Sequence, residues 1–168
     1  APQTSDNKTC YTPPVTEDFV TAKEKRLTKL VRDELSDGRK CLAFATYTNL
    51  GVSKRLETLL GDALQGYSIK CLPSSVEASK REKWIKDNPC DVLICNPELV
   101  KTGLDLLEYP TIIFYQTTYN VFTLKQAARR SWRIGQDKNV KVIFMTYDKT
   151  SQRKALSLIS RKVAAANS

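Results

Sequence analysis

Histidine is absent from this sequence of 168 residues, and the cysteines are not spaced as metal ligands. Without histidine, zinc sites that use imidazole and catalytic triads that use it as a base are excluded. The five cysteines contain no C-x-x-C pair, and Cys41, Cys71 and Cys95 lie within or at the end of apolar runs. We therefore expect reduced thiols in the core and no metal site.

Long apolar runs are also missing, since no stretch reaches the eighteen residues that a membrane-spanning helix needs. The N-terminal residues APQTSDNKTC have neither the basic start nor the apolar centre of a signal peptide. We expect a soluble, cytoplasmic protein that does not bind a membrane. Its length, with 41% hydrophobic and 27% charged residues, is typical of one globular domain.

The residues that are present predict an α/β fold. Residues 1–15, rich in proline and threonine, are interpreted as a tail or linker, and residues 16–168 as a single domain. An apolar stripe from Thr16 predicts a helix that ends near Asp37 and Gly38. Short apolar runs then alternate with helical stretches, one of which opens with the capping-box pattern of Ser74 and Glu77. The five predicted strands are 41–46, 68–72, 91–95, 111–115 and 140–147.

Strands this apolar, joined by crossover helices, indicate an open and mainly parallel sheet that is buried on both faces under helices. In such sheets ligands bind beyond the carboxyl ends of the strands. This rule points to residues 46–48, 96–106 and 116–120, and to the helical run that follows them.

Positive charge is concentrated in the last quarter of the chain. The net charge is +9, yet residues 1–124 hold 16 basic and 16 acidic residues, whereas residues 125–168 hold 11 basic and 2 acidic ones. Such an excess is typical of a protein that binds a polyanion, either a nucleotide or a nucleic-acid backbone. A solvated basic face is the alternative that charge alone leaves open.

Arg130 and Arg133 stand three residues apart, a spacing that places both on one face of a helix, with Gln126 a turn earlier. Two guanidinium groups in this arrangement suit the oxygens of a phosphoryl group in transfer. A surface helix with solvated arginines has the same spacing, so this pattern alone does not decide between the two.

The segment from Gln126 to Gln136 resembles motif VI of superfamily-2 helicases, in the form Q-A-x-x-R-x-x-R-I-G-Q of the Swi/Snf-type double-stranded DNA translocases. The resemblance covers roughly residues 20–165 and implies a RecA-like second lobe. It implies that Arg130 and Arg133 reach the γ-phosphate of ATP on a partner lobe, as arginine fingers supported by Gln126.

Two further segments resemble family motifs. The strand Lys40 to Phe44 with Thr46 is similar to motif IV, whose end faces nucleic acid. Residues 91–94 and 103–106 are similar to motif V, which implies that Gly103 and Asp105 lie at the nucleotide. Lys101 and Thr102, in the same loop, are candidates for a DNA phosphate, with exposure to solvent as the alternative.

The chain departs from the family in motif V, where Val100-Lys101 and Asp105 replace the usual Gly-Gly pair and Asn. In motif VI, Trp132 replaces a common histidine. The phrase NPELVKTGLDL is similar to a divergent bacterial or mobile-element branch, for which a nucleoid-associated location is expected. Arg81 stands where the family has an arginine before a helix.

No G-x-x-x-x-G-K-[ST] loop and no acidic strand end of the D-E-x-H type occur in the chain. The resemblance therefore implies half of a two-lobe motor. It implies that ATP and Mg²⁺ are bound mainly by an N-terminal lobe and that this part alone is inactive. The implied partners are that lobe and DNA, double-stranded in the family's manner. A non-catalytic basic module that binds nucleic acid is the alternative function. A complete small-molecule enzyme is not supported, because the sequence shows no nucleophile, base or Gly-rich loop for such a site.

Overall fold

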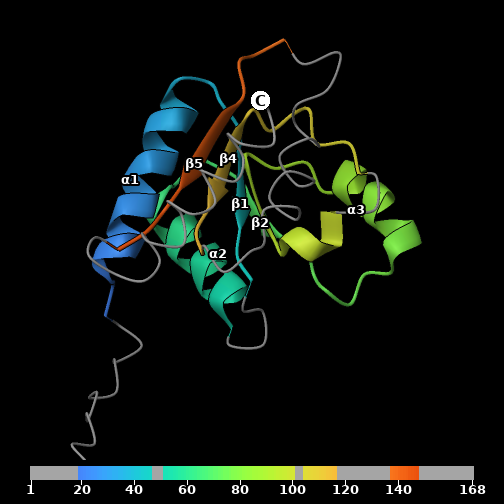
Figure 1. Cartoon of the computed structure of the whole chain (residues 1–168), viewed down its shortest axis with the longest axis horizontal. Helices are drawn as coiled ribbons and strands as arrows, with labels where there is room; N and C mark the ends of the chain where they lie inside the picture. Colours follow the sequence, from blue (N-terminus) through green and yellow to red (C-terminus); the bar gives the residue numbers. More distant parts are fainter. Residues whose placement is uncertain (1–18, 47–50, 101–103, 117–136, 148–168) are drawn as a thin grey trace, which may run out of the picture.

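The computed structural model describes residues 19–46, 51–100, 104–116 and 137–147, and its strands form one five-stranded sheet (Figure 1). The strand order is β2-β3-β1-β4-β5, and all four neighbouring pairs are parallel. The strands are β1 Cys41–Phe44, β2 Ile69–Cys71, β3 Val92–Cys95, β4 Thr111–Phe114 and β5 Lys141–Phe144. The predicted α/β class with an open parallel sheet is confirmed.

Helices cover both faces of the sheet, as expected. Successive side chains of a strand point to opposite faces, and β1 divides its residues accordingly. Cys41 and Ala43 pack in a core with α1 (Ala22–Ser36) and α2 (Val52–Ala63), whereas Leu42 and Phe44 belong to a second core that includes side chains of α3 (Arg81–Asp87). In Figure 1, α1 and α2 lie on one side of the molecule and α3 on the other.

The expectation that every strand is buried on both faces holds for the three inner strands and is wrong for the two at the edges. All residues of β1, β3 and β4 are buried, whereas β2 is half-buried and β5 begins with two exposed residues. Val142 of β5 is 41% exposed. An edge strand has a neighbour on one side only, so apolar composition does not guarantee its burial.

Helix α1 begins later than the apolar stripe from Thr16 predicts. Thr21 caps the helix, and its hydroxyl accepts a hydrogen bond from the N–H of Glu24 at 3.2 Å. The Glu24 carboxylate accepts from the N–H of Thr21 at 2.8 Å, which completes a capping box. Phe19 therefore lies before the helix and is 57% exposed. The T-x-x-E pattern that fixes this start was present in the sequence.

Helix α1 ends where the sequence predicts. Gly38 has φ 72°, in the left-handed region that favours glycine. Its N–H donates to the carbonyl of Leu35, and the N–H of Arg39 donates to the carbonyl of Glu34 at 2.9 Å. This pair of hydrogen bonds satisfies the last carbonyls of α1 and turns the chain into β1.

The predicted capping box of Ser74 and Glu77 is wrong. A turn closed by a hydrogen bond from the N–H of Val76 to the carbonyl of Pro73 occupies this stretch, and the 3₁₀ turn η2 (Ala78–Lys80) precedes α3. Glu77 flanks η2 without a capping hydrogen bond from its side chain, and its carboxylate pairs with Lys80 at 3.0 Å. Because of the turn after Pro73, the helix begins only at Arg81, so Ser74 and Glu77 lie before it.

A buried ionic cluster ties the end of α1 to the starts of β4 and β5. The Glu34 carboxylate accepts hydrogen bonds from Arg39 Nε at 3.0 Å, Thr111 Oγ1 at 2.7 Å and Lys141 Nζ at 2.9 Å. Arg39 also donates to the carbonyl of Asn139 at 2.6 Å. Burial opposes the charge on Glu34, but these donors outweigh it, so the pKa of the carboxyl is held below its ordinary value. The cluster therefore fixes the edge strand β5 to the helix layer.

The prediction that the cysteines lie in the core holds for three of the four cysteines that the structure describes. Cys41, Cys90 and Cys95 are free and buried, and Cys71 is free and half-buried. Burial raises the pKa of the Cys41 thiol to about 12, so it stays protonated and unreactive. Within the described ranges, no helix is long and apolar enough to cross a membrane, and no three potential ligand residues gather as a metal site.

Candidate functional site at the carboxyl edge of the sheet

Three polar residues meet where β1, β3 and β4 end. The side-chain oxygen of Gln116, two residues after β4, accepts a hydrogen bond from the N–H of Thr46 at 2.6 Å. The side-chain nitrogen of Asn96, directly after β3, donates to the carbonyl of Thr46 at 3.1 Å. Asn96 also accepts from the N–H of Glu98 at 3.0 Å, which fixes the turn into η3 (Pro97–Val100). Two amide side chains thus hold the backbone that leaves the central strand.

This arrangement places the predicted Thr46 at the edge where ligands bind in open α/β sheets. The sequence also pointed to the loops that contain Asn96 and Gln116, but it did not predict that their amides clamp Thr46. The available signal was a single amide residue soon after a fully apolar strand. Such residues are candidates for fixing the backbone before a functional loop.

Asp105 is exposed, and its carboxylate accepts a hydrogen bond from the N–H of Leu107 at 3.2 Å. It lies close enough to Lys86, in the last turn of α3, to help raise the pKa of that ammonium, after the larger effect of Glu82. Asp105 lies between η3 and the start of β4 in the chain. Its role at a nucleotide stays a prediction.

The other predicted site residues lie outside the described residues: Lys101, Thr102, Gly103, Gln126, Arg130 and Arg133. Their neighbours in the chain are placed. Val100 and Leu104, on either side of the first group, are both buried. The second group belongs to the connection that leaves β4 at Gln116, beside Thr46, and enters β5 from Asp137.

Arg81, which the resemblance singled out, has a structural position at the start of α3. Its Nε donates to the carbonyl of Val76 at 3.1 Å, and its Nη1 donates to the carbonyl of Leu99 at 3.2 Å. One guanidinium therefore joins the turn before η2 to η3. This contact fixes η3 immediately before the loop with Lys101.

A cation lies between aromatic rings near the start of α1. The ammonium of Lys23 is 4.8 Å from the ring centroid of Tyr115 and 5.3 Å from that of Tyr147. Burial lowers the pKa of Lys23 and raises the pKa of Tyr115 to about 12. The two tyrosines follow β4 and β5, so this cation–π contact joins the ends of both strands to α1.

Beside it, Glu24 links the two helices that cover this face. Arg55 of α2 donates from Nε and Nη2 to the two oxygens of the Glu24 carboxylate, the second bond at 3.1 Å. Hydrogen bonding from Arg55 is the main reason that the pKa of Glu24 lies below its ordinary value. Nη2 of Arg55 also donates to the carbonyl of Phe19 at 2.7 Å. The same carboxylate therefore caps α1 and anchors α2.

These two carboxylates predict an acid-sensitive fold. Because the pKa values of Glu24 and Glu34 are lowered by folding, the stability they give is complete above their ordinary value of 4.5 and is lost as the pH falls through the folded values. We expect the free energy of unfolding to fall as the pH drops below about 4.5, and to fall less in Glu24→Gln. Urea unfolding across this range measures it. Parallel pH profiles for the variant and the parent chain would contradict the assignment.

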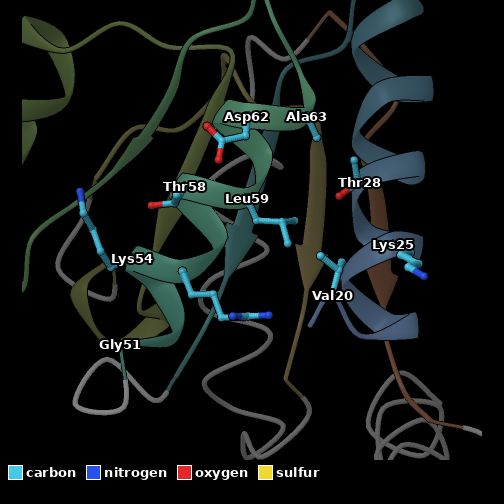
Figure 2. Close-up of a pocket in the computed structure, with 10 residues that line it drawn as sticks. Val20, Lys25, Thr28, Gly51, Lys54, Thr58, Leu59, Asp62 and Ala63 are labelled. Carbon is cyan, nitrogen blue, oxygen red and sulfur yellow. The ribbon is translucent and has the colours of Figure 1, made fainter. Parts of the chain in front are cut away.

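An open groove of about 1110 Å³ lies between α1 and α2. Figure 2 shows Lys25 and Thr28 on one wall and Lys54 and Asp62 on the other. Lys54 pairs with Glu57 at 2.7 Å, Arg55 pairs with Glu24, and Asp62 adds a negative charge. The groove therefore does not concentrate positive charge as a phosphate site does. It contains none of the site residues predicted from the sequence.

An open parallel sheet in this order, with polar residues gathered at the carboxyl ends of three inner strands, defines a RecA-like α/β lobe. The comparisons with known proteins agree. The crystal structure of the C-terminal part of the Fun30 ATPase domain has a TM-score of 0.72 at 24% identity, over 83% of this chain and 45% of that chain. At this identity the likeness shows the fold alone.

The family model "Helicase conserved C-terminal domain" matches residues 22–135. The chain belongs to this family, as the C-terminal lobe of a superfamily-2 helicase, and it is similar to helicases of the Swi/Snf type. It is 31% identical to the chromodomain-helicase-DNA-binding protein 1-like of Mus musculus over 78% of the chain and 15% of that protein. It is 27% identical to the helicase SWR1 of Debaryomyces hansenii over 86% of the chain and 9% of that protein. The chain thus spans less than a sixth of these relatives.

Proposed function

We propose that this chain is the second lobe of an ATP-dependent DNA helicase or translocase. In this proposal Arg130 and Arg133, supported by Gln126, act as arginine fingers on ATP that is held by an N-terminal lobe. Gly103 and Asp105 lie near the nucleotide, and Thr46, Lys101 and Thr102 contact DNA, double-stranded in the family's manner. The cytoplasmic location and the bacterial or mobile-element branch stay predictions.

The observation that carries the proposal is the hydrogen-bonded junction of Thr46, Asn96 and Gln116. It brings together the strand ends that lead into all three sequence motifs. The motif IV candidate is at the junction itself, Asn96 lies between the two parts of the motif V candidate (residues 91–94 and 103–106), and the connection to the motif VI candidate starts after Gln116. A hydrogen-bonded junction at this point supports one binding site shared by the three motifs, because loops that start from the same fixed edge of a sheet stay close to one another.

The described groups at this edge fit a lobe that completes a nucleotide site better than one that holds the nucleotide by itself. Thr46, Asn96 and Gln116 offer neutral hydroxyl and amide groups, which suit hydrogen bonds to phosphate or sugar oxygens. Mg²⁺ prefers carboxylate and phosphate oxygens, whereas the side chains of these three residues are neutral. We therefore assign ATP and Mg²⁺ mainly to the N-terminal lobe, and expect the isolated chain to be inactive.

The mechanism that follows is closure of two lobes. When the lobes close, the guanidinium groups meet the phosphoryl group in transfer and neutralise the charge that develops on it. When the lobes open after hydrolysis, the affinity of each lobe for DNA changes. Tight binding that alternates between the two lobes converts the cycle of hydrolysis into movement along the DNA strand.

Arginine-to-lysine substitutions distinguish this function from that of a non-catalytic basic module, which the excess charge of residues 125–168 favours. Lysine keeps the charge that attracts a phosphate backbone but loses the planar fork of guanidinium. We expect Arg130→Lys and Arg133→Lys, in the full protein, to lower ATP hydrolysis at least about tenfold while DNA affinity stays within about threefold. Hydrolysis and filter-binding assays at one salt concentration measure both. Unchanged hydrolysis in both variants would favour the basic module.

A further inference from the structure

The hydrogen-bond pattern of β1 ends at Thr46. In a parallel strand the N–H and the C=O of one residue point towards the same neighbouring strand, and the side alternates from one residue to the next. The N–H of Ala45 donates to the carbonyl of Cys95 in β3 at 3.1 Å, so both backbone groups of Thr46 are expected to face β4. Its N–H does meet Gln116, after β4, but its carbonyl meets Asn96, after β3. Two side chains on opposite sides therefore hold Thr46 where the strand pattern ends.

The amide of Asn96 is oriented by its own neighbours. Its side-chain oxygen accepts from the N–H of Glu98 at 3.0 Å, which leaves the side-chain nitrogen as the donor to the carbonyl of Thr46. The backbone carbonyl of Asn96 accepts from the N–H of Leu99 at 3.0 Å, and the carbonyl of Leu99 accepts from Arg81 at 3.2 Å. The donor to Thr46 thus belongs to a hydrogen-bonded turn with a fixed direction.

Gln116 follows a residue that is held on two sides. The N–H of Tyr115 donates to the carbonyl of Phe44 at 3.1 Å, and the Tyr115 ring centroid lies 4.8 Å from the Lys23 ammonium. From this base the side-chain oxygen of Gln116 reaches the Thr46 nitrogen at 2.6 Å. Both amides therefore act on Thr46 from parts of the chain that are themselves fixed.

Fixing the backbone of Thr46 also fixes its hydroxyl. Threonine is branched at Cβ, which leaves its side chain few rotamers, so the direction of the hydroxyl follows from that of the backbone. Thr46 and both amide residues are half-buried, and hydrogen bonds there compete less with water than at an open surface. A hydroxyl that is ordered beforehand loses little conformational freedom when it binds a phosphate oxygen.

We propose that Asn96 and Gln116 are positioning residues, which fix the Thr46 hydroxyl for a phosphate oxygen of DNA. They act through the backbone of Thr46 and tie its position to the segments that follow β3 and β4. The inference rests on the proposed function, in which Thr46 contacts DNA. It adds that the contact depends on two amides that do not themselves touch DNA.

Two substitutions of Gln116 separate positioning from direct contact. Gln116→Glu keeps an oxygen acceptor for the Thr46 N–H and adds a charge that repels DNA, whereas Gln116→Leu is neutral and loses the acceptor. Charge, or an amide that binds DNA directly, predicts tighter binding by the neutral variant. Positioning predicts the reverse order. We expect Gln116→Leu to raise the Kd for a DNA duplex at least about tenfold, and Gln116→Glu to raise it no more than about threefold.

Asn96→Asp is matched to Gln116→Glu, because both replace an amide by a carboxylate at the same edge of the sheet. Asn96→Asp keeps the acceptor for the Glu98 N–H but loses the donor, and it sets a carboxylate oxygen against the carbonyl of Thr46. We expect its Kd for the duplex to exceed that of Gln116→Glu at least about fivefold. Equal values for the two variants would mean that only the added charge matters, and would overturn the role of Asn96.

A double-mutant cycle tests whether Gln116 acts through Thr46. Thr46→Val keeps the backbone and the branched shape and removes only the hydroxyl. We expect Thr46→Val and Gln116→Leu each to raise the Kd at least about fivefold, and the double variant to stay within about twofold of the weaker single variant. A purely structural role of Gln116 predicts instead that the two effects multiply, and that result would overturn the proposal.

The Kd values are measured on the full protein without ATP at one salt concentration, with thermal unfolding of each variant. If Gln116→Leu does not fold, the comparison of Asn96→Asp with Gln116→Glu decides. Because no ATP is present, the result does not depend on the arginine fingers, and a failure of Arg133 leaves it standing. If Thr46→Val binds DNA as the parent protein does, the DNA contact itself is wrong and the positioning role falls with it. If Thr46→Val weakens binding and Gln116→Leu does not, the positioning role alone is overturned.

Discussion

Arg133→Ala is expected to lower DNA-stimulated ATP hydrolysis by about 10³-fold to 10⁵-fold in the protein that contains this chain, the range found for loss of an arginine finger. The reason is that guanidinium neutralises charge that appears only as the phosphoryl group is transferred, so its removal raises the barrier more than it weakens ATP binding. Steady-state hydrolysis with saturating DNA and ATP measures the loss. Far-ultraviolet circular dichroism of the variant is expected to match that of the parent protein.

Arg129→Ala is the matched control, because helical spacing predicts that Arg129 lies on a different face from Arg130 and Arg133. It removes the same charge from the same run and is expected to change hydrolysis by no more than about threefold. If Arg133→Ala retains hydrolysis within about twofold of the parent protein, the assignment of this residue as a finger is wrong.

Glu34→Ala is expected to lower the free energy of unfolding of the chain by about 3 kcal/mol. The substitution leaves Arg39 and Lys141 without their carboxylate, and the Arg39 side chain is only 12% exposed. Removing one partner of a buried pair is costly because the other charge stays buried without compensation. We place the effect at the lower end of the usual range because Lys141 is about half exposed and regains water.

Asp33→Ala, one residue earlier on the same helix, is the control. Asp33 pairs with Lys29 at 2.9 Å, with both side chains more than 60% exposed, so its loss is expected to change stability by less than about 1 kcal/mol. Urea unfolding at neutral pH compares the two variants. Equal destabilisation by both substitutions would show that the Glu34 cluster is no stronger than a surface pair.

The sheet was predictable because β1 and β3 are apolar at every position and β4 at every position but Thr111, a composition typical of strands that are covered on both faces. The exposure of Val142 in β5 was not predictable from its apolar side chain, because the edge position of β5 follows from the order of the strands in the sheet. Likewise, Phe19 belongs to the apolar stripe in the sequence but lies outside α1, because the hydrogen bonds of Thr21 and Glu24 start the helix later.

For the candidate site, the sequence pointed to the edge at which Asn96 and Gln116 hold Thr46, because the carboxyl ends of parallel strands gather at one edge of a sheet. Thr46 was predicted by its position after an apolar strand. The clamp on its backbone was not, since the hydrogen bonds of Asn96 and Gln116 join residues that are 50 and 70 positions away in the chain. The spacing of residues within a short segment does not predict hydrogen bonds between residues so far apart in the sequence.

The central position of β1 has a consequence for how the chain folds during synthesis. Both hydrogen-bonded neighbours of β1 come later in the sequence, β3 from Val92 and β4 from Thr111. Cys41–Phe44 therefore leaves the ribosome about fifty residues before its first partner strand does, and until then only local helices are able to form. A nascent chain that stalls in this interval exposes an unpaired apolar strand, which makes it a target for chaperones.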